Sequence, residues 1–157
     1  MDEDNSLGKP ALTESKENAE IGALDGILGF HIRLAHGAVY RHFAETFSDL
    51  GLTQKQVSVL WLVGDQPGIS QIEVGSRLHM DRATTMTIVN RLQDRGYLRR
   101  ERSEADGRKQ ALYLTESGHD GLAEAKQCIA SHESWLKNRF TRQEIEKLVE
   151  MLARIHE

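Results

Sequence analysis

Residues 82–95 carry side chains that can hydrogen-bond to the edges of DNA bases, at a spacing that fits one face of a helix. A helical wheel gives this segment one face for packing against the rest of the protein, formed by Thr85, Ile88, Val89 and Leu92. The opposite face carries Ala83, Met86, Thr87 and Asn90, flanked by Arg82, Thr84 and Arg91. Thr and Asn can pair with base edges, Ala and Met can contact thymine methyl groups, and Arg can bind guanine or phosphate. The segment is therefore a candidate DNA-recognition helix, and the alternative is an ordinary solvated helix face.

A second set of cations follows directly, at the tip of a predicted β-hairpin. Arg108 and Lys109 come after Asp106-Gly107, a tight-turn signal between alternating segments at residues 97–102 and 110–114. Such a tip can reach the minor groove beside a helix in the major groove, because the negative potential there attracts arginine. We expect Asp106 to orient Arg108 through a charge-assisted pair. The alternative is turn chemistry with a surface ion pair, which contributes about 0–1 kcal/mol.

The charge of the chain is concentrated in this region. The 157 residues have a net charge of −4, but residues 77–109 hold nine Arg or Lys against five Asp or Glu, a local charge of +4. Residues 1–20 hold two Lys against six acidic residues. A basic segment within an acidic protein is the electrostatic footprint of a nucleic-acid partner.

The elements that position these groups are mostly helices. Apolar spacing predicts a helix from residue 21 to about 50, and Thr53, Ser70 and Thr141 each precede a Gln or Glu by three positions, as capping boxes do. Helices over about 71–78 and 82–95, joined by a three-residue turn, have the spacing of a helix-turn-helix. Further helices are expected from Thr115 to the mid-130s and over 141–156. The predicted fold is mainly α with a small two-stranded β-wing.

The stretch from Gly51 to Gly118 resembles the multiple-antibiotic-resistance regulator (MarR) family of winged-helix repressors. The matching segments are Leu52-Thr53, Met80–Thr85, Arg91–Leu98, Asp106-Gly107-Arg108 and Leu114–Gly118. The resemblance covers about residues 21–157 and identifies residues 20–157 as a single MarR-type domain. It implies that residues 51–114 form the winged helix-turn-helix, and that residues 20–50 and 115–157 form the dimerisation helices of a homodimer. Residues 1–19 are expected to be a disordered acidic tail.

Apolar stripes near both ends of the chain are compatible with such a dimer, including Leu148, Leu152 and Ile155. Two-fold symmetry predicts a pseudo-palindromic DNA operator with half-sites about 10 bp apart. The resemblance also implies an aromatic, often anionic, effector bound between the dimerisation and DNA-binding regions, and its usual action is to release a repressor from the operator.

The first helix is rich in polar aromatic residues, in the region that lines the effector pocket of the family. The candidate ligand-binding residues for a phenol or aryl carboxylate are Phe30, His31, Arg33, His36, Tyr40 and Trp61, with Phe43 as a possible wall. The alternative is that these residues are satisfied locally in the core or at the surface.

Other functional classes find less support. The helical histidines lack the i, i+4 spacing of a zinc pair, and the one cysteine, Cys128, fits a packed thiol better than a redox sensor, so metal or redox sensing is a weaker alternative. The sequence contains no phosphate-binding loop, HExxH motif or nucleophile elbow, so neither an enzyme nor a cofactor is expected. A winged-helix protein-interaction module remains an alternative. The absence of a long apolar run and a signal peptide predicts a cytoplasmic protein without a membrane partner.

Overall fold

The computed structural model describes residues 21–157, which divide into two units, residues up to His36 and residues from Gly37 to Glu157. The first unit contains the 3₁₀ helix η1 (Gly22–Gly26) and the first turns of α1 (Leu28–Thr46). The single helix expected from residue 21 to about 50 is therefore wrong at both ends. Ile27 has an extended backbone, with φ −95° and ψ 106°, and separates η1 from α1. The predicted acidic tail lies outside the described residues.

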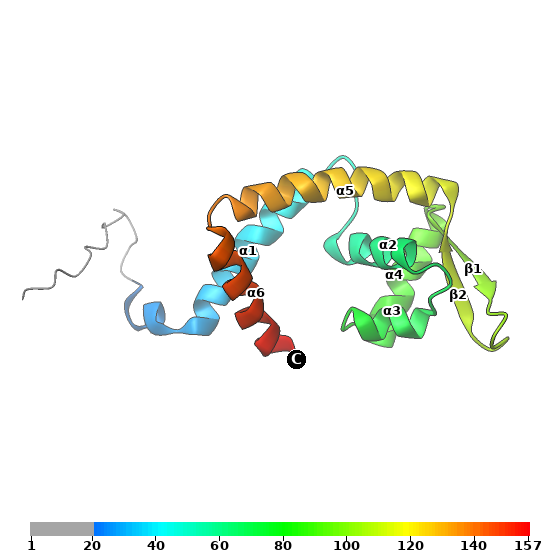
Figure 1. Cartoon of the computed structure of the whole chain (residues 1–157), viewed down its shortest axis with the longest axis horizontal. Helices are drawn as coiled ribbons and strands as arrows, with labels where there is room; N and C mark the ends of the chain where they lie inside the picture. The colour runs from blue at the N-terminus through cyan, green and yellow to red at the C-terminus, as the bar shows by residue number, and fades with distance from the viewer. Residues whose placement is uncertain (1–20) are drawn as a thin grey trace, which may run out of the picture. The chain divides into compact units, whose positions relative to one another are not determined.

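The remaining elements follow the predicted order (Figure 1). They are α2 (Gln54–Asp65), α3 (Gln71–Arg77), α4 (Arg82–Asp94), β1 (Leu98–Arg102), β2 (Gln110–Leu114), α5 (Glu116–Lys137) and α6 (Arg142–His156). This mainly α fold with one antiparallel strand pair confirms the predicted fold class. Within the described residues, none of the helices is both long and apolar enough to cross a membrane.

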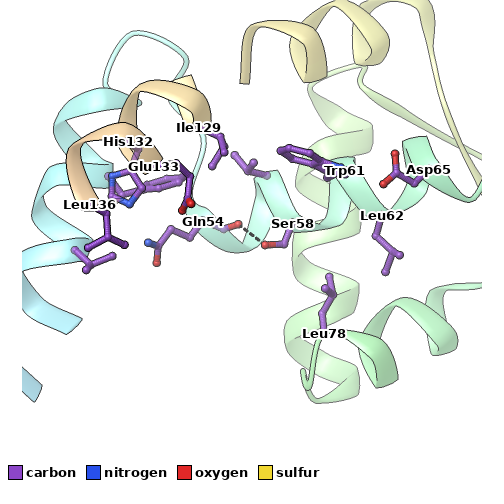
Figure 2. A pocket seen from close by; sticks show the side chains of 13 residues that line it. Gln54, Ser58, Trp61, Leu62, Asp65, Leu78, Ile129, His132, Glu133 and Leu136 are labelled. Carbon is purple, nitrogen blue, oxygen red and sulfur yellow. Dashed lines mark hydrogen bonds between the residues drawn. The ribbon is translucent and has the colours of Figure 1, made fainter. Parts of the chain in front are cut away.

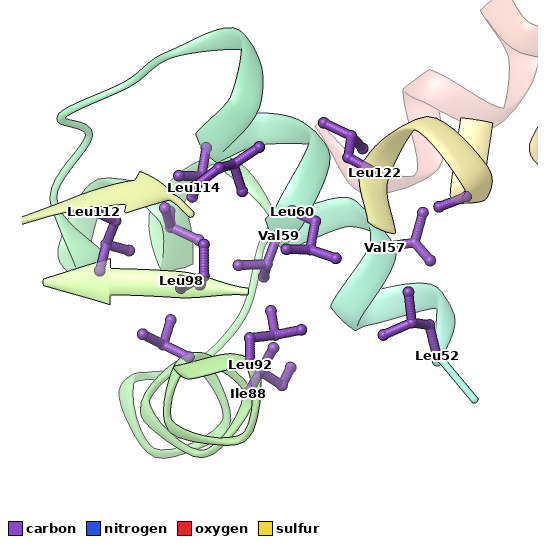
Figure 3. Close-up of a cluster of buried hydrophobic side chains, with 14 of the residues drawn as sticks. Leu52, Val57, Val59, Leu60, Ile88, Leu92, Leu98, Leu112, Leu114 and Leu122 are labelled. Atoms are coloured by element: carbon purple, nitrogen blue, oxygen red, sulfur yellow. The ribbon is translucent and has the colours of Figure 1, made fainter. Parts of the chain in front are cut away.

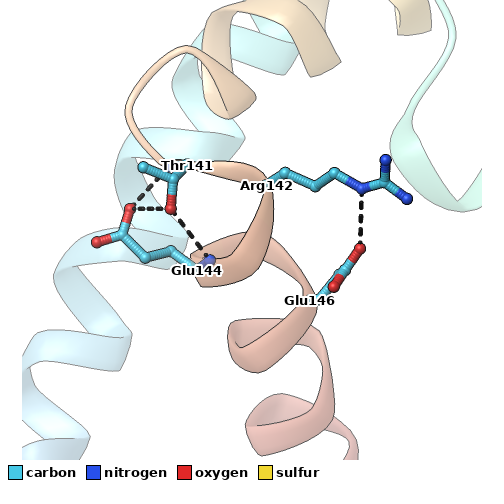
Figure 4. Close-up of polar contacts among 4 residues, drawn as sticks. All are labelled: Thr141, Arg142, Glu144 and Glu146. Carbon is cyan, nitrogen blue, oxygen red and sulfur yellow. Dashed lines mark hydrogen bonds and ion pairs between the residues drawn. The ribbon is translucent and has the colours of Figure 1, made fainter.

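Local hydrogen bonds explain where the helices begin and end. The side chains of Thr53, Ser70 and Thr141 each accept from the backbone N–H three residues on, and the Gln or Glu at that position accepts from the N-cap backbone in return. Figure 4 shows this reciprocal pair at Thr141 and Glu144. These contacts confirm all three predicted capping boxes, each of which satisfies amides that a helix terminus leaves free.

A shared apolar core holds the helix-turn-helix against the hairpin and α5 (Figure 3). α4 contributes Val89 and Leu92, which are fully buried, and the strands contribute Leu98 and Leu112. Gly96 follows the C-cap of α4, and its φ of +79° allows Tyr97 N–H to donate to Leu92 O, the bond that defines a Schellman motif. This sharp end directs the chain from the recognition helix straight into β1.

The hairpin differs from its prediction at the tip. Register pairs Leu98 with Leu114 and Arg102 with Gln110, which leaves residues 103–109 as a seven-residue loop. Asp106-Gly107 is thus not a two-residue hairpin turn, and Gly107 does not have positive φ. A turn within the loop is closed by Lys109 N–H donating to Asp106 O over 2.8 Å.

Candidate nucleic-acid interface

α4 presents the polar face that its sequence predicts. Thr85, Ile88, Val89 and Leu92 are buried, whereas Met86, Thr87 and Asn90 are exposed on the other side. Asp81 caps the helix: its carboxylate accepts from the hydroxyl and the N–H of Thr84, and these bonds hold the pKa of Asp81 below its usual value. Of the other predicted contact residues, Ala83, Arg82 and Arg91 are exposed and Thr84 is half-buried.

A close approach between α3 and α4 fixes the direction of this face. A Cβ atom on Gly75 would lie 2.8 Å from Thr85 Oγ1 and 3.2 Å from Met80 O, so only glycine lets the two helices come this near. Met80 N–H donates to Gly75 O over 2.9 Å, and His79 takes a positive φ of 50° in the turn. The segment that leads into α3 is bonded to the hairpin, because Leu112 N–H donates to Ile69 O. The recognition helix and the hairpin are therefore parts of one packed body.

Several of the arginine side chains in residues 77–109 are bonded to other groups of the protein. Arg77 donates to Gln66, Arg95 donates to backbone carbonyls at residues 50 and 51, and Arg99 pairs with Glu101. Among the nine cationic side chains of residues 77–109, all of which the structure describes, five have no hydrogen bond or ion pair: Arg82, Arg91, Arg102, Arg108 and Lys109. These five lie on α4 and on the hairpin, and they are the cations available to a polyanion.

Asp106 acts differently from its predicted role. Its Oδ1 accepts from the backbone N–H of Arg108 over 3.1 Å. Among the described residues there is no ion pair between its carboxylate and the Arg108 guanidinium, so the expected charge-assisted pair is wrong. Asp106 shapes the loop through an Asx turn, and the guanidinium of Arg108 stays exposed.

The role of one residue in this region could not be predicted from the sequence. Arg100 on β1 donates to the side-chain carbonyls of Gln93 and Asn90 on α4 and of Gln71 on α3. The contact joins three elements that are distant along the chain, and no local pattern marks it. In the sequence, Arg100 is not distinguishable from the other arginines of the predicted strand.

The six predicted effector residues are divided between the two units. In the first, His31 Nε2 is 2.7 Å from Asp25 O, Arg33 lies over the Phe30 ring at 5.2 Å, and His36 is exposed. In the second, Tyr40 is exposed on α1, and Trp61 of α2 lines a cavity.

That cavity has a volume of about 600 Å³ and is formed by α1, α2, α5 and the residue that follows α3 (Figure 2). Most of its wall is apolar, and Lys126 Nζ lies 4.7 Å from the centre of the Trp61 ring. The lining residues are Val39, Phe43, Gln54, Val57, Ser58, Trp61, Leu62, Asp65, Leu78, Ile129, His132, Glu133 and Leu136.

A histidine pair stands at one wall of the cavity. The Nδ1 atoms of His42 and His132 are 2.8 Å apart, and Trp135 stacks on His42 with a centroid distance of 3.9 Å. Burial and the adjacent His42 lower the pKa of His132, whose exposed fraction is 4%. Burial and the repulsion between two imidazolium groups at this distance both disfavour the charged form of His132.

This lowered pKa makes folding stability depend on pH. The unfolded chain takes up a proton near the ordinary histidine pKa of 6.5, whereas folded His132 does so only at lower pH. The free energy of unfolding should therefore fall as pH drops below 6.5, by up to about 1.4 kcal/mol per pH unit for one proton. Melting curves between pH 7.5 and 5 measure this slope, which His132→Gln should reduce and His119→Gln, at an exposed histidine, should leave unchanged. Equal slopes in all three proteins would contradict the assignment.

Comparisons with known proteins agree with this geometry. A model of the MarR family matches residues 50–109. A candidate regulator of the hcr operon from Thauera aromatica is 30% identical over 150 residues, which cover 95% of this chain and 90% of that protein.

The similarity to solved structures extends over nearly the whole chain. The transcriptional repressor CouR bound to a 23-mer DNA duplex superposes with a TM-score of 0.83 at 32% identity, covering 90% of this chain and 100% of CouR. CouR bound to p-coumaroyl-CoA superposes with a TM-score of 0.79 at 31% identity, covering 88% of this chain and 98% of CouR. These relatives are transcriptional regulators and not enzymes. The chain belongs to the MarR family of DNA-binding transcriptional regulators.

Proposed function

We propose that this regulator is a homodimeric repressor that binds a pseudo-palindromic operator and leaves it when a small aromatic ligand binds. α4 would enter the major groove, and the loop between β1 and β2 would reach the adjacent minor groove. The observation that carries this proposal is the exposed face of α4, where Thr87 and Asn90 lie between the unpaired cations Arg82 and Arg91. The DNA-bound CouR structure supports the same docking.

Exposed apolar surface on α6 supports the homodimer. None of the residues of α6 is buried, although Val149, Leu152 and Ile155 expose 61%, 42% and 63% of their surface. A groove of about 190 Å³ between α5 and α6 adds Leu136 and Phe140 to this surface. A monomer would leave the whole stripe in water, so a second copy is the occupant that we propose. Two-fold symmetry would then place two copies of α4 about one turn of DNA apart, roughly 10 bp.

Replacing Arg108 by alanine should weaken operator binding and flatten its dependence on salt. Each phosphate contact that a protein loses reduces the slope of log K against log [salt] by about 0.9. The change can be measured by fluorescence anisotropy over a salt series, with the dimer checked by sedimentation. Lys55→Ala removes an exposed cation at the start of α2 and is the control. If Arg108→Ala keeps the wild-type slope, the loop does not contact DNA.

The cavity beside Trp61 is the proposed effector site. Its volume of about 600 Å³ lies within the range of roughly 300–1,000 Å³ typical of small-molecule sites. Trp61 and Phe43 supply ring surfaces for an aromatic ligand. The CouR complex with p-coumaroyl-CoA supports a phenolic acid or its thioester as the class of ligand.

The hydrogen bonds of His42 support a specific role for His132 in binding the ligand. The Thr46 hydroxyl donates to His42 O over 2.8 Å, so toward His42 Nδ1, at 3.3 Å, its oxygen can only accept. His42 Nδ1 therefore carries a hydrogen, and His132 Nδ1 accepts it. Neutral His132 then has its own hydrogen on Nε2, where it can donate to a carboxylate, carbonyl or phenol oxygen of the ligand.

Titration of aromatic acids and their thioesters into an operator complex tests this site. A ligand that fits should release the DNA, and His132→Phe should raise the ligand concentration needed by about 10-fold, the loss expected for one hydrogen bond to a charged group. His119→Phe, at an exposed position on α5, is the control. If none of these compounds releases DNA or shifts the melting temperature, the cavity is not an effector site for this class.

A further inference from the structure

Arg100 holds three side-chain amides around one guanidinium group. Its Nη1 donates to Gln93 Oε1 over 2.5 Å, and its Nη2 donates to Asn90 Oδ1 over 2.6 Å and to Gln71 Oε1 over 3.1 Å. Asn90 and Gln93 belong to the recognition helix and are exposed, whereas Arg100 is half-buried on β1. One internal cation thus contacts two amides that lie where α4 would meet DNA.

The chemistry of the guanidinium fixes how these amides are turned. Arginine has five N–H donors and no acceptor, so an amide beside it must present its carbonyl oxygen and direct its NH₂ group elsewhere. A flipped amide would bring donor against donor. Both bonds have a charged donor, and such charge-assisted bonds are stronger than bonds between neutral groups.

The position of Arg100 also leaves one of its hydrogen-bond donors without a partner. Its Nε is buried, and it is the one buried side-chain nitrogen or oxygen among the described residues that lacks a partner. Most buried polar groups in proteins are satisfied, so an exception such as this calls for an explanation. Orientation of the recognition-helix amides is an explanation that the observed bonds provide.

We propose that Arg100 restricts Asn90 and Gln93 to donating hydrogen bonds, so that this part of α4 prefers guanine to adenine in the major groove. Guanine presents two acceptors there, N7 and O6, whereas adenine presents the N7 acceptor and the N6 amino donor. Asparagine or glutamine reads adenine by accepting from N6 while donating to N7. A cation at 2.6 Å from Asn90 Oδ1 opposes the approach of that amino group and favours the oxygen of guanine. This inference rests on the proposed operator binding and adds which base this part of α4 recognises.

Selection of bound duplexes from a random-sequence DNA library tests the proposal with the full-length protein. Selection with Asn90→Ala identifies the operator position that Asn90 contacts, because the base preference is lost there. Wild type should enrich guanine at that position. Arg100→Met keeps the unbranched apolar stem of the side chain and removes its donors, so the guanine-to-adenine ratio at this position should fall by about 10-fold. Arg99→Met is the matched control, because Arg99 pairs with Glu101 and lies over the Tyr113 ring.

Asn90→Asp gives a second test that leaves Arg100 in place. A carboxylate can pair with the guanidinium but has no NH₂ group, so this variant should lose the guanine preference even though the strand arginine is intact. An unchanged guanine-to-adenine ratio in both Arg100→Met and Asn90→Asp, or enrichment of adenine by wild type, would overturn the proposal. Failure of wild type to enrich any sequence would instead reject the operator binding on which the proposal rests.

Discussion

Replacing Leu148 and Leu152 by glutamate is expected to separate the proposed dimer into monomers and to lower operator affinity by at least about 100-fold, since a dimer gains 10²–10⁴ from joining two binding modules. Both residues lie on the apolar side of α6, which has no buried residue in the single chain. Carboxylates placed at an interface must lose their hydration without a partner, which costs several kcal/mol for each group. Sedimentation velocity and anisotropy with the same preparations would measure the two effects together.

The control for this variant places a carboxylate elsewhere on the same helix. Gln143 is exposed and lies opposite Leu152 on a helical wheel of α6. Gln143→Glu should therefore remain dimeric and bind DNA as wild type does. If the Leu148→Glu, Leu152→Glu variant is still a dimer with wild-type affinity, α6 does not form the interface.

Gly118→Ala is expected to destabilise the fold by at least about 3 kcal/mol, at the upper end of the usual cost of overpacking. Gly118 lies in the first turn of α5, and a Cβ atom there would be 2.0 Å from the backbone oxygen of Tyr97. The same oxygen accepts from Thr115 N–H over 3.0 Å, so it cannot move away without breaking that bond. Because the contact is with backbone, a change of side-chain rotamer cannot relieve it.

Thermal unfolding measures this effect directly. A loss of 3 kcal/mol should lower Tm by about 6–12 °C for a chain of this length. Gly107→Ala is the matched control, since no atom lies within 4 Å of a Cβ built there and its φ is ordinary. The control should stay within about 0.5 kcal/mol of wild type. Equal melting temperatures for the two variants would show that α5 and Tyr97 do not approach as closely as described.

The parts of the fold that depend on local chemistry could be predicted from the sequence. The burial of Thr85, Val89 and Leu92 follows from helical periodicity, and the helix starts follow from hydroxyl groups placed three residues before Gln or Glu. The same periodicity identified the exposed face of α4, because the buried residues leave only one side for solvent. This is why the family resemblance and the pattern of residues led to the same DNA-binding region.

The parts that depend on contacts distant in sequence could not be predicted. Asp106-Gly107 is a local hairpin signal, but the strand register leaves it within a longer loop. Nothing near Arg100 or His132 in the sequence indicates that one contacts three amides or that the other pairs with His42. Of the nine cations in residues 77–109, five remain unpaired because the other four, Arg77, Arg95, Arg99 and Arg100, are bonded within the protein. Counting residues in the sequence cannot separate these two groups.

Equilibrium binding of the purified protein to a selected duplex and to a shuffled duplex of the same composition tests the central claim most directly. With α4 reading bases and the hairpin loop contacting phosphates, the selected duplex should bind at least about 1,000-fold more tightly at physiological salt. Affinity for both duplexes should fall steeply as salt increases. Equal affinity for the two sequences, or no binding to either at low ionic strength, would contradict the account.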